Sequence, residues 1–292
     1  MKKSIYKLGF IFCLILFSLN SFSQNSQDSI KSRIETIDGN EYIGFILERS
    51  AEKIRVKTDK LGEITIPAGE VKRISEVTVS QAKDGTYWLD NPQATRYFWA
   101  PNGYNLKKGE GYYQNVWVFF NQAVYGITDH FSAGIGTMPL FLLGTSEFPI
   151  WLTLKYSVPV VKDKINLGAG VLAGTVTGEN GYAGIFYGIG TFGSKDKNLN
   201  IGLGWGFVEG EISSTPLVNI GGLIRTGKNG YMITENYLII NSGEMVCFSM
   251  FGGRRIIRNF GIDFGLGIPW GAGVESFVAI PWLGFTVPFG KK

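Results

Sequence analysis

Residues that could act on a substrate are few in this chain. Its 292 residues include one histidine, His130, which stands between Asp129 and Phe131. A neutral imidazole can accept a proton from a serine hydroxyl or from water, so one histidine could serve an acid–base site. The charged and polar residues before His130 are typical of a turn between strands. We therefore expect His130 to be a turn residue and the chain to have no catalytic site.

Ligands for metal ions and cofactors are also missing from the sequence pattern. The two cysteines are Cys13 and Cys247, and with a single histidine they form no ligand cluster. The glycine pairs in 168–170 and 188–190 have the spacing of one strand face. No helix is predicted after them, as a phosphate-binding loop would require. We expect no metal site and no cofactor.

Charged residues set among apolar ones are the other candidates for a function. Trp151 and Lys155 alternate with leucines, and Arg225 and Asp263 lie in similar runs. Because successive side chains of a strand point to opposite faces, these four residues are predicted to face the interior of a β-barrel. Opposite charges there could line a narrow polar path for solutes. They could also pair with one another and fill the interior, which is the arrangement we favour.

These residues belong to a long series of predicted strands. In the clearest strand, Phe260, Ile262, Phe264, Leu266 and Ile268 alternate with small residues, which is the period of two typical of a strand. The sequence predicts about twelve strands, most of them near the length that crosses a bilayer when tilted. Their ranges are 95–100, 113–127, 131–142, 150–159, 165–176, 183–192, 199–209, 216–225, 231–241, 245–254, 259–268 and 275–287.

Every second connection between these strands is short and polar. These connections are 128–130, 162–164, 194–198, 227–230 and 255–259. In bacterial outer-membrane barrels the short turns lie on the periplasmic side. The remaining connections would then face outward, and 101–111 is predicted to be the longest of them.

The small-residue face of the strands distinguishes two all-β folds. A soluble β-sandwich turns Lys, Glu and Thr to water, whereas here that face carries glycines such as Gly168, Gly170, Gly202 and Gly204. The other face is apolar, and a closed sheet pairs every backbone group within lipid. We predict an all-β chain in which residues 95–292 form an antiparallel transmembrane β-barrel. The residues expected to face outward include Ile150, Leu152, Leu154, Tyr156, Ile201, Leu203, Trp205 and Phe207.

The first 23 residues are typical of a secretory signal peptide. Three lysines precede the apolar run 8–19, and Ser23 is the expected cleavage position. Removing these three lysines from a formal net charge of +4 leaves about +1. The basic composition therefore does not indicate a nucleic-acid partner.

Residues 29–79 form a separate, charge-rich region. Five short strands are predicted there, and Asp38-Gly39 between the first two is a favoured hairpin turn. The strand order, with Gly44, Gly62 and Pro67, resembles SH3-like and Sm-like modules, which are small β-barrels. Residues 80–94 are predicted to be a linker. The expected core residues are Ile34, Ile43, Phe45, Leu47, Ile54, Val56, Ile64, Ile66 and Ile74.

Both ends of the chain carry features of a known class of protein. Ser21-Phe22-Ser23-Gln24, the glycine–aromatic strands and the ending Pro288-Phe289-Gly290-Lys291-Lys292 resemble Bacteroidota-type outer-membrane β-barrel proteins. The resemblance implies the outer membrane of a Gram-negative bacterium, with the small domain in the periplasm. It implies outer-membrane lipid and the barrel-assembly machinery as partners, and it defines no activity. Asp28-Ser29-Ile30 also resembles an O-glycosylation acceptor motif, although a plain linker is the favoured interpretation.

Three functions fit these expectations. The leading prediction is a structural role without catalysis, in which residues 29–79 dock a periplasmic protein partner. The alternative is a narrow passive channel for small solutes. An outer-membrane lipid-modifying hydrolase comes third, because His130 is predicted at the periplasmic rim and not beside the outer leaflet. RNA binding, as in Sm proteins, is disfavoured by the even mix of acids and bases in residues 29–79.

Overall fold

The computed structural model describes residues 29–58, 61–81, 87–89, 91, 93–139, 147–241, 243–257 and 260–290. The predicted signal peptide 1–23 and the terminal Lys291-Lys292 lie outside these residues. Contacts divide the chain into two compact units, Met1–Asp90 and Asn91–Lys292. The division lies inside the predicted linker 80–94, and each unit is described by itself.

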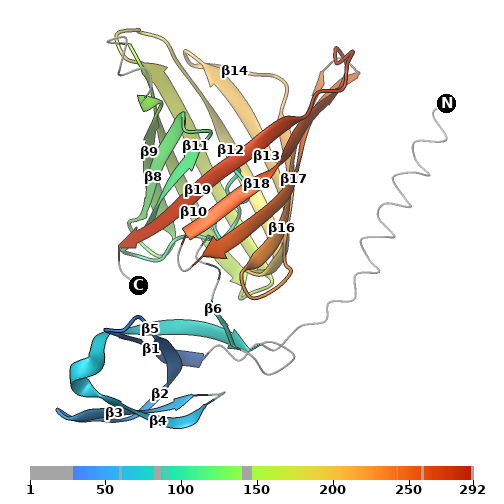
Figure 1. Cartoon of the computed structure of the whole chain (residues 1–292). Helices are drawn as coiled ribbons and strands as arrows, with labels where there is room; N and C mark the ends of the chain where they lie inside the picture. The colour runs from blue at the N-terminus through green and yellow to red at the C-terminus, as the bar shows by residue number, and fades with distance from the viewer. Residues whose placement is uncertain are drawn as a thin grey trace. The chain divides into compact units, whose positions relative to one another are not determined.

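The first unit is an antiparallel sheet with the strand order β4-β3-β2-β1-β5-β6 (Figure 1). A 3₁₀ turn, η1, joins β4 to β5. The SH3-like or Sm-like assignment stays a prediction. The elements are β1 (Ser29–Thr36), β2 (Glu41–Arg49), β3 (Lys53–Thr58), β4 (Gly62–Pro67), η1 (Ala68–Glu70), β5 (Val71–Gln81) and β6 (Tyr87–Leu89).

The core of this unit corrects the predicted face of β2. Ile34 is buried in the core and pairs with Tyr42 across the sheet. Tyr42, Gly44 and Ile46 therefore face the core. Phe45 and Leu47, which were predicted to be core residues, are 42% and 46% exposed. The prediction chose the face of β2 that carries the larger apolar residues, whereas the core face carries Gly44. A Cβ at Gly44 would lie 2.3 Å from the Lys57 carbonyl oxygen, which leaves no room for a side chain.

The second unit confirms the predicted barrel of about twelve antiparallel strands. Among the described residues, twelve strands follow one another around the barrel, and the pairings β19–β7 and β12–β13 close it (Figure 1). A two-residue strand, β14 (Glu211–Ile212), extends beside β13. The twelve are β7 (Glu110–Val116), β8 (Phe120–Gly126), β9 (Phe131–Thr137), β10 (Pro149–Val161), β11 (Ile165–Val176), β12 (Tyr182–Ser194), β13 (Lys197–Val208), β15 (Leu217–Arg225), β16 (Gly230–Asn241), β17 (Glu244–Ile257), β18 (Phe260–Gly271) and β19 (Ile280–Gly290).

The beginning of the barrel differs from the prediction in two compensating ways. Residues 95–100 are not a wall strand, and the single strand predicted over 113–127 is two strands, β7 and β8. The turn between them contains no Gly, Pro, Asn or Asp, so no turn signal marks it in the sequence. Instead, Trp117 and Val118 adopt φ values of 52° and 67°, a region that bulky residues rarely enter.

The two rims of the barrel differ in the length of their connections. The tight turns 127–130, 162–164, 195–196 and 226–229 share one rim with the start of β7 and the end of β19, and β17 ends and β18 begins at the same rim. Residues 101–111 were predicted to form the longest outer connection, and the structure shows that this prediction is wrong. They precede β7 and lead into it at the tight-turn rim, where the Lys108 N–H donates to Asp129 Oδ1 at 2.8 Å.

The outer face of the barrel is apolar and the inner face is polar. Leu152, Phe251 and Leu283 are 56%, 61% and 60% exposed, whereas inward residues of the same strands are buried. Such an outer surface is suited to hydrocarbon, because the closed sheet leaves no unpaired edge. No helix within the described ranges is long and apolar enough to cross a membrane.

Candidate functional site: the filled interior of the barrel

Residue 91 and residues 93–106, called here the inserted segment, lie inside the barrel, whereas Lys107 and Lys108 are exposed where the chain leads into β7. Tyr97, Phe98 and Asn102 have no exposed surface. The segment contacts strands around the whole circumference: Asn102 and its neighbours meet β10 and β12, whereas Tyr97 and its neighbours meet β13 and β17. It folds back on itself, with the Tyr97 N–H donating to the Ala100 carbonyl at 2.9 Å. The barrel is therefore filled by a chain segment in addition to wall side chains.

A buried cluster of three charged groups ties the segment to the wall. Asp263 on β18 accepts two hydrogen bonds from Arg254 on β17, at 2.5 Å and 3.1 Å. It accepts a third from Arg96 of the inserted segment at 2.9 Å. Arg96 also donates to the Thr286 hydroxyl on β19. Both arginines and the aspartate are buried, so the charges offset one another within a site of low dielectric constant.

Two wall cations hold backbone carbonyls of the segment. Arg254 donates to the carbonyls of Gln93 at 2.9 Å and Tyr97 at 2.5 Å. Lys155 on β10 donates to the carbonyls of Asn102 at 3.2 Å and Tyr104 at 2.5 Å. These bonds satisfy carbonyls that have no partner in a regular sheet, which is why an irregular segment can be buried.

Glu235 on β16 provides the complementary contact for backbone N–H groups. Its carboxylate is fully buried, and it accepts the Trp99 N–H at 3.0 Å and the Tyr237 hydroxyl at 2.5 Å. The segment thus has its carbonyls bound by Arg254 and Lys155 and one of its amides bound by Glu235. Charged wall residues bind the backbone of the segment, and side chains of the segment also contact the wall.

The glycines of the wall provide space for the segment. A Cβ at Gly221 would lie 2.7 Å from the Tyr97 ring, and a Cβ at Gly261 would lie 2.1 Å from the Gln93 amide nitrogen. Both distances are shorter than real Cβ contacts, so each glycine makes room for one side chain of the segment.

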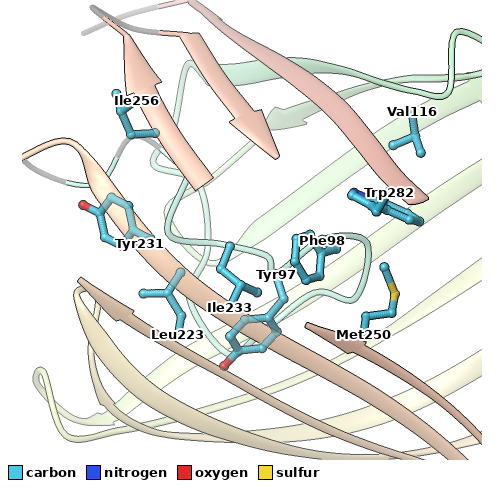
Figure 2. Close-up of a cluster of buried hydrophobic side chains, with 9 residues drawn as sticks. All are labelled: Tyr97, Phe98, Val116, Leu223, Tyr231, Ile233, Met250, Ile256 and Trp282. Atoms are coloured by element: carbon cyan, nitrogen blue, oxygen red, sulfur yellow. The ribbon is translucent and has the colours of Figure 1, made fainter. Parts of the chain in front are cut away.

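An apolar cluster surrounds Tyr97 and Phe98. Figure 2 shows these two side chains among wall residues, and all members of the cluster are buried. Burial of Tyr97 raises the pKa of its phenol, and its hydroxyl donates to Asn198 at 2.6 Å. The wall members are Val116, Leu223, Tyr231, Ile233, Met250, Ile256 and Trp282.

Aromatic rings continue from this cluster toward the turn between β7 and β8. Trp99 lies 6.0 Å from Phe120 and 6.3 Å from Trp151 between ring centroids. Trp117, in the strained turn, lies 4.9 Å from Trp282, and its indole donates to the Pro281 carbonyl. Edge and tilted contacts of this kind are favourable, so the turn strain positions Trp117 against the cluster.

The four residues predicted to face the interior are found in two places. Trp151, Lys155 and Asp263 are buried inside the barrel and contact or lie beside the inserted segment. Arg225 lies near the tight-turn rim, where it donates to Asp196 at 2.9 Å and to the Lys228 carbonyl. The structure therefore separates Arg225 from the other three.

The prediction missed Arg96, Arg254 and Glu235, which complete the interior network. Arg254 lies on the same strand face as Met250, and Glu235 on the same face as Ile233, so strand alternation could have found both. Arg96 was assigned to a wall strand, and its pairing with Asp263 spans 167 residues of sequence. No local pattern reveals such a contact.

His130 and Cys247 show no arrangement for catalysis. The His130 ring contacts the Ser157 carbonyl through Nδ1 at 3.1 Å and lies beside the ring of Tyr156. Cys247 is a buried free thiol. The described ranges contain no group of three His, Cys, Asp or Glu residues that could hold a metal ion.

Comparisons with known proteins find remote similarity to solved structures. The NanC porin matches with a TM-score of 0.39 and 10% identity, covering 63% of this chain and 99% of its own. OpdQ from Pseudomonas aeruginosa matches with a TM-score of 0.36 and 9% identity, covering 93% and 100%. A loop-deletion mutant of OmpT from Vibrio cholerae matches with a TM-score of 0.36 and 11% identity, covering 90% and 97%. No protein-family model matches the sequence, and no curated protein matches it.

Proposed function

We propose that the protein is an outer-membrane channel for small solutes that the inserted segment closes. The observation that carries the proposal is that a separate chain segment fills the lumen. A barrel with a purely structural role can fill its interior with wall side chains. Here the wall carries glycines at Gly221 and Gly261 where the segment lies, so displacement of the segment would leave open space.

The polar contacts between the inserted segment and the wall support a segment that can move out of the lumen. It is held largely by hydrogen bonds and ion pairs to Lys155, Glu235 and Arg254. Water can replace these bonds when the segment moves, because charged groups are well solvated in an aqueous lumen. The same side chains would then line the narrow polar path that was the alternative function.

The direction of the barrel follows from its connections. Tight turns lie on the periplasmic side of bacterial barrels, so we place the rim with turns 162–164 and 195–196 toward the periplasm. The chain enters the barrel at this rim, where Asn91 donates to the Lys195 carbonyl. Residues 29–81 precede Asn91, and we therefore assign them to the periplasm.

A liposome swelling assay tests the channel. The variant replaces residues 93–104 with a flexible Gly-Ser linker of the same length, and heat-modifiable migration confirms that the barrel has folded. We expect small neutral solutes to enter liposomes that contain this variant much faster than liposomes that contain the intact protein. A folded variant that admits solute no faster than empty liposomes would contradict a channel.

A docking role for residues 29–79 is a second candidate, favoured by one observation. Phe45 and Leu47 lie side by side on the outer face of β2, and each is more than two-fifths exposed. Exposed apolar pairs of this kind often mark interaction surfaces. In-cell cross-linking of the full-length protein should trap a periplasmic partner that Phe45→Ser/Leu47→Ser abolishes. The same cross-linking in the double variant would contradict docking at this face.

A further inference from the structure

A small cavity with both polar and apolar lining lies between the inserted segment and strands β7 to β12. Its volume is about 70 Å³. A cavity needs about 10–15 Å³ on this measure to hold one water molecule, so the space fits a few waters or one small hydrated ion. Lys155 and Arg96 contribute to its lining. The other polar lining residues are Thr95, Gln122, Ser132, Thr153 and Tyr187.

The charges buried inside the barrel do not balance. Three cations, Arg96, Lys155 and Arg254, and two carboxylates, Glu235 and Asp263, are the buried charged residues of the described part of the second unit. Asp263 is bound by both arginines, whereas Glu235 accepts hydrogen bonds from two neutral groups, the Trp99 N–H and the Tyr237 hydroxyl. Lys155 contacts backbone carbonyls. One positive charge is therefore in excess, and a buried charge is costly without a counter-charge.

The cavity also contains hydrogen-bond donors in excess. Arg96 Nε is buried and has no hydrogen-bond partner among the described residues. This guanidinium N–H can only donate, whereas the three N–H groups of the Lys155 ammonium already donate to the carbonyls of Thr95, Asn102 and Tyr104, so Lys155 contributes its charge. Elsewhere in the described barrel, the buried atoms without a partner include two further donors, Asn166 Nδ2 and Trp282 Nε1. An occupant of the cavity must therefore accept hydrogen bonds, and it should carry negative charge.

We propose that this cavity binds one small inorganic anion, of the size of chloride or bromide, between Lys155 and Arg96. The anion would supply the missing negative charge and accept bonds from the cavity side chains. The inference deepens the proposed channel and rests on it in one respect. When the inserted segment is displaced, Arg96 leaves with it, and the Lys155 ammonium on the wall would favour anions along its part of the lumen.

Binding is tested without any measurement of conductance. The intact protein is folded and crystallised in bromide, and anomalous scattering locates the ion. We expect a bromide peak in the cavity within hydrogen-bonding distance of Arg96 Nε. Chloride NMR line broadening in detergent should show about tenfold weaker binding in Lys155→Met and retained binding in Lys155→Arg.

Two matched variants separate the site from the fold. Tyr187→Phe removes a cavity hydroxyl and leaves the hydrogen bonds described above between segment and wall unchanged, and it should weaken chloride binding. Lys228→Met removes a rim lysine and should leave chloride binding unchanged. No bromide peak in the intact protein, or equal chloride binding in Lys155→Met, would overturn the site and show that the cavity holds only water.

Ion selectivity then distinguishes failure of the site from failure of the channel. The variant with the Gly-Ser linker in place of residues 93–104 lacks Arg96, so its remaining buried wall charges, those of Lys155, Arg254, Glu235 and Asp263, sum to zero. In a potassium chloride gradient, Lys155→Met in that variant should therefore shift the reversal potential toward potassium selectivity. Bromide binding without conductance would retain the site and refute the channel. Conductance that is not altered by Lys155→Met would refute the selectivity.

Discussion

Asp263 connects the inserted segment to the barrel wall at the scale of single residues. Its carboxylate accepts bonds from Arg254 on the neighbouring strand and from Arg96 in the segment. Both arginines also donate to backbone carbonyls of residues 93–98. The position of the segment thus depends on a single buried negative charge, because removal of that charge leaves two buried cations close together.

The first prediction concerns that charge. Asp263→Asn should destabilise the barrel by about 3–5 kcal/mol, since it leaves Arg254 and Arg96 buried without their carboxylate. Thermal unfolding in detergent, followed by loss of heat-modifiable migration, measures the effect. The triple variant Arg96→Met/Arg254→Met/Asp263→Leu should recover much of the loss, because it leaves no charge of this cluster buried without a partner. An unfolding temperature of Asp263→Asn equal to that of the wild type would contradict this role.

A second residue-scale prediction concerns the strained turn between β7 and β8. Val118 is 79% exposed and has φ 67°, so its side chain contributes little packing while the backbone is strained. Val118→Gly should stabilise the barrel by about 1 kcal/mol, because glycine adopts this conformation without steric cost. Val160→Gly, at an exposed position within β10, serves as the control and should destabilise the barrel. Destabilisation by Val118→Gly would contradict the strain.

At the scale of elements, the wall and the inserted segment are matched through small residues. Gly221→Ala should displace the segment, because its Cβ would lie 2.7 Å from the buried Tyr97 ring. We expect more frequent openings in single-channel recordings with the barrel still folded. Gly188→Ala on β12 is the matched control, since a Cβ there has no atom within 4 Å. Identical recordings for the two variants would show that Tyr97 does not hold the segment in place.

The elements also show what the sequence could and could not predict. The wall strands were predictable because lipid and lumen impose a period of two, as in β18, where Phe264 alternates with Gly265. Within the inserted segment, residues 95–100 were predicted as a strand because they contain polar and aromatic residues in a strand-like pattern. Its true place is fixed by contacts with β10, β17 and β18, more than fifty residues away in sequence. Local periodicity contains no information about such contacts.

For the candidate site, too, strand alternation predicted which side chains face inward but not which partners they contact. Lys155 and Asp263 could be placed inside the barrel by strand parity, and the structure finds them buried there. Arg225 has the same parity, but its place near the rim depends on the exact end of β15. The partners of Asp263 could not be predicted, because pairing inside a barrel depends on registers that parity does not determine.

The whole molecule combines a closed lipid-facing barrel with an interior that a preceding segment fills. The apolar exterior is continuous, whereas the interior contains buried charges, glycines and a small cavity. A barrel that serves only as an anchor needs the apolar exterior, but it does not need an interior of this kind. The central claim is therefore that the inserted segment closes a lumen and must move for solutes to pass.

A reversible cross-link between the segment and the wall tests this claim most directly. A Cβ at Gly103 would lie 2.9 Å from the Asn166 Cβ and 2.7 Å from the Asn166 carbonyl oxygen, so Gly103→Cys/Asn166→Cys can form a disulfide once the segment shifts away from that carbonyl. Cys247→Ser provides the background, and Gly103→Cys alone, which carries the same added Cβ, is the control. Single-channel current should be absent when the disulfide is formed and should appear after reduction. Equal current in the oxidised and reduced states, with the control unaffected by reductant, would contradict closure by the segment.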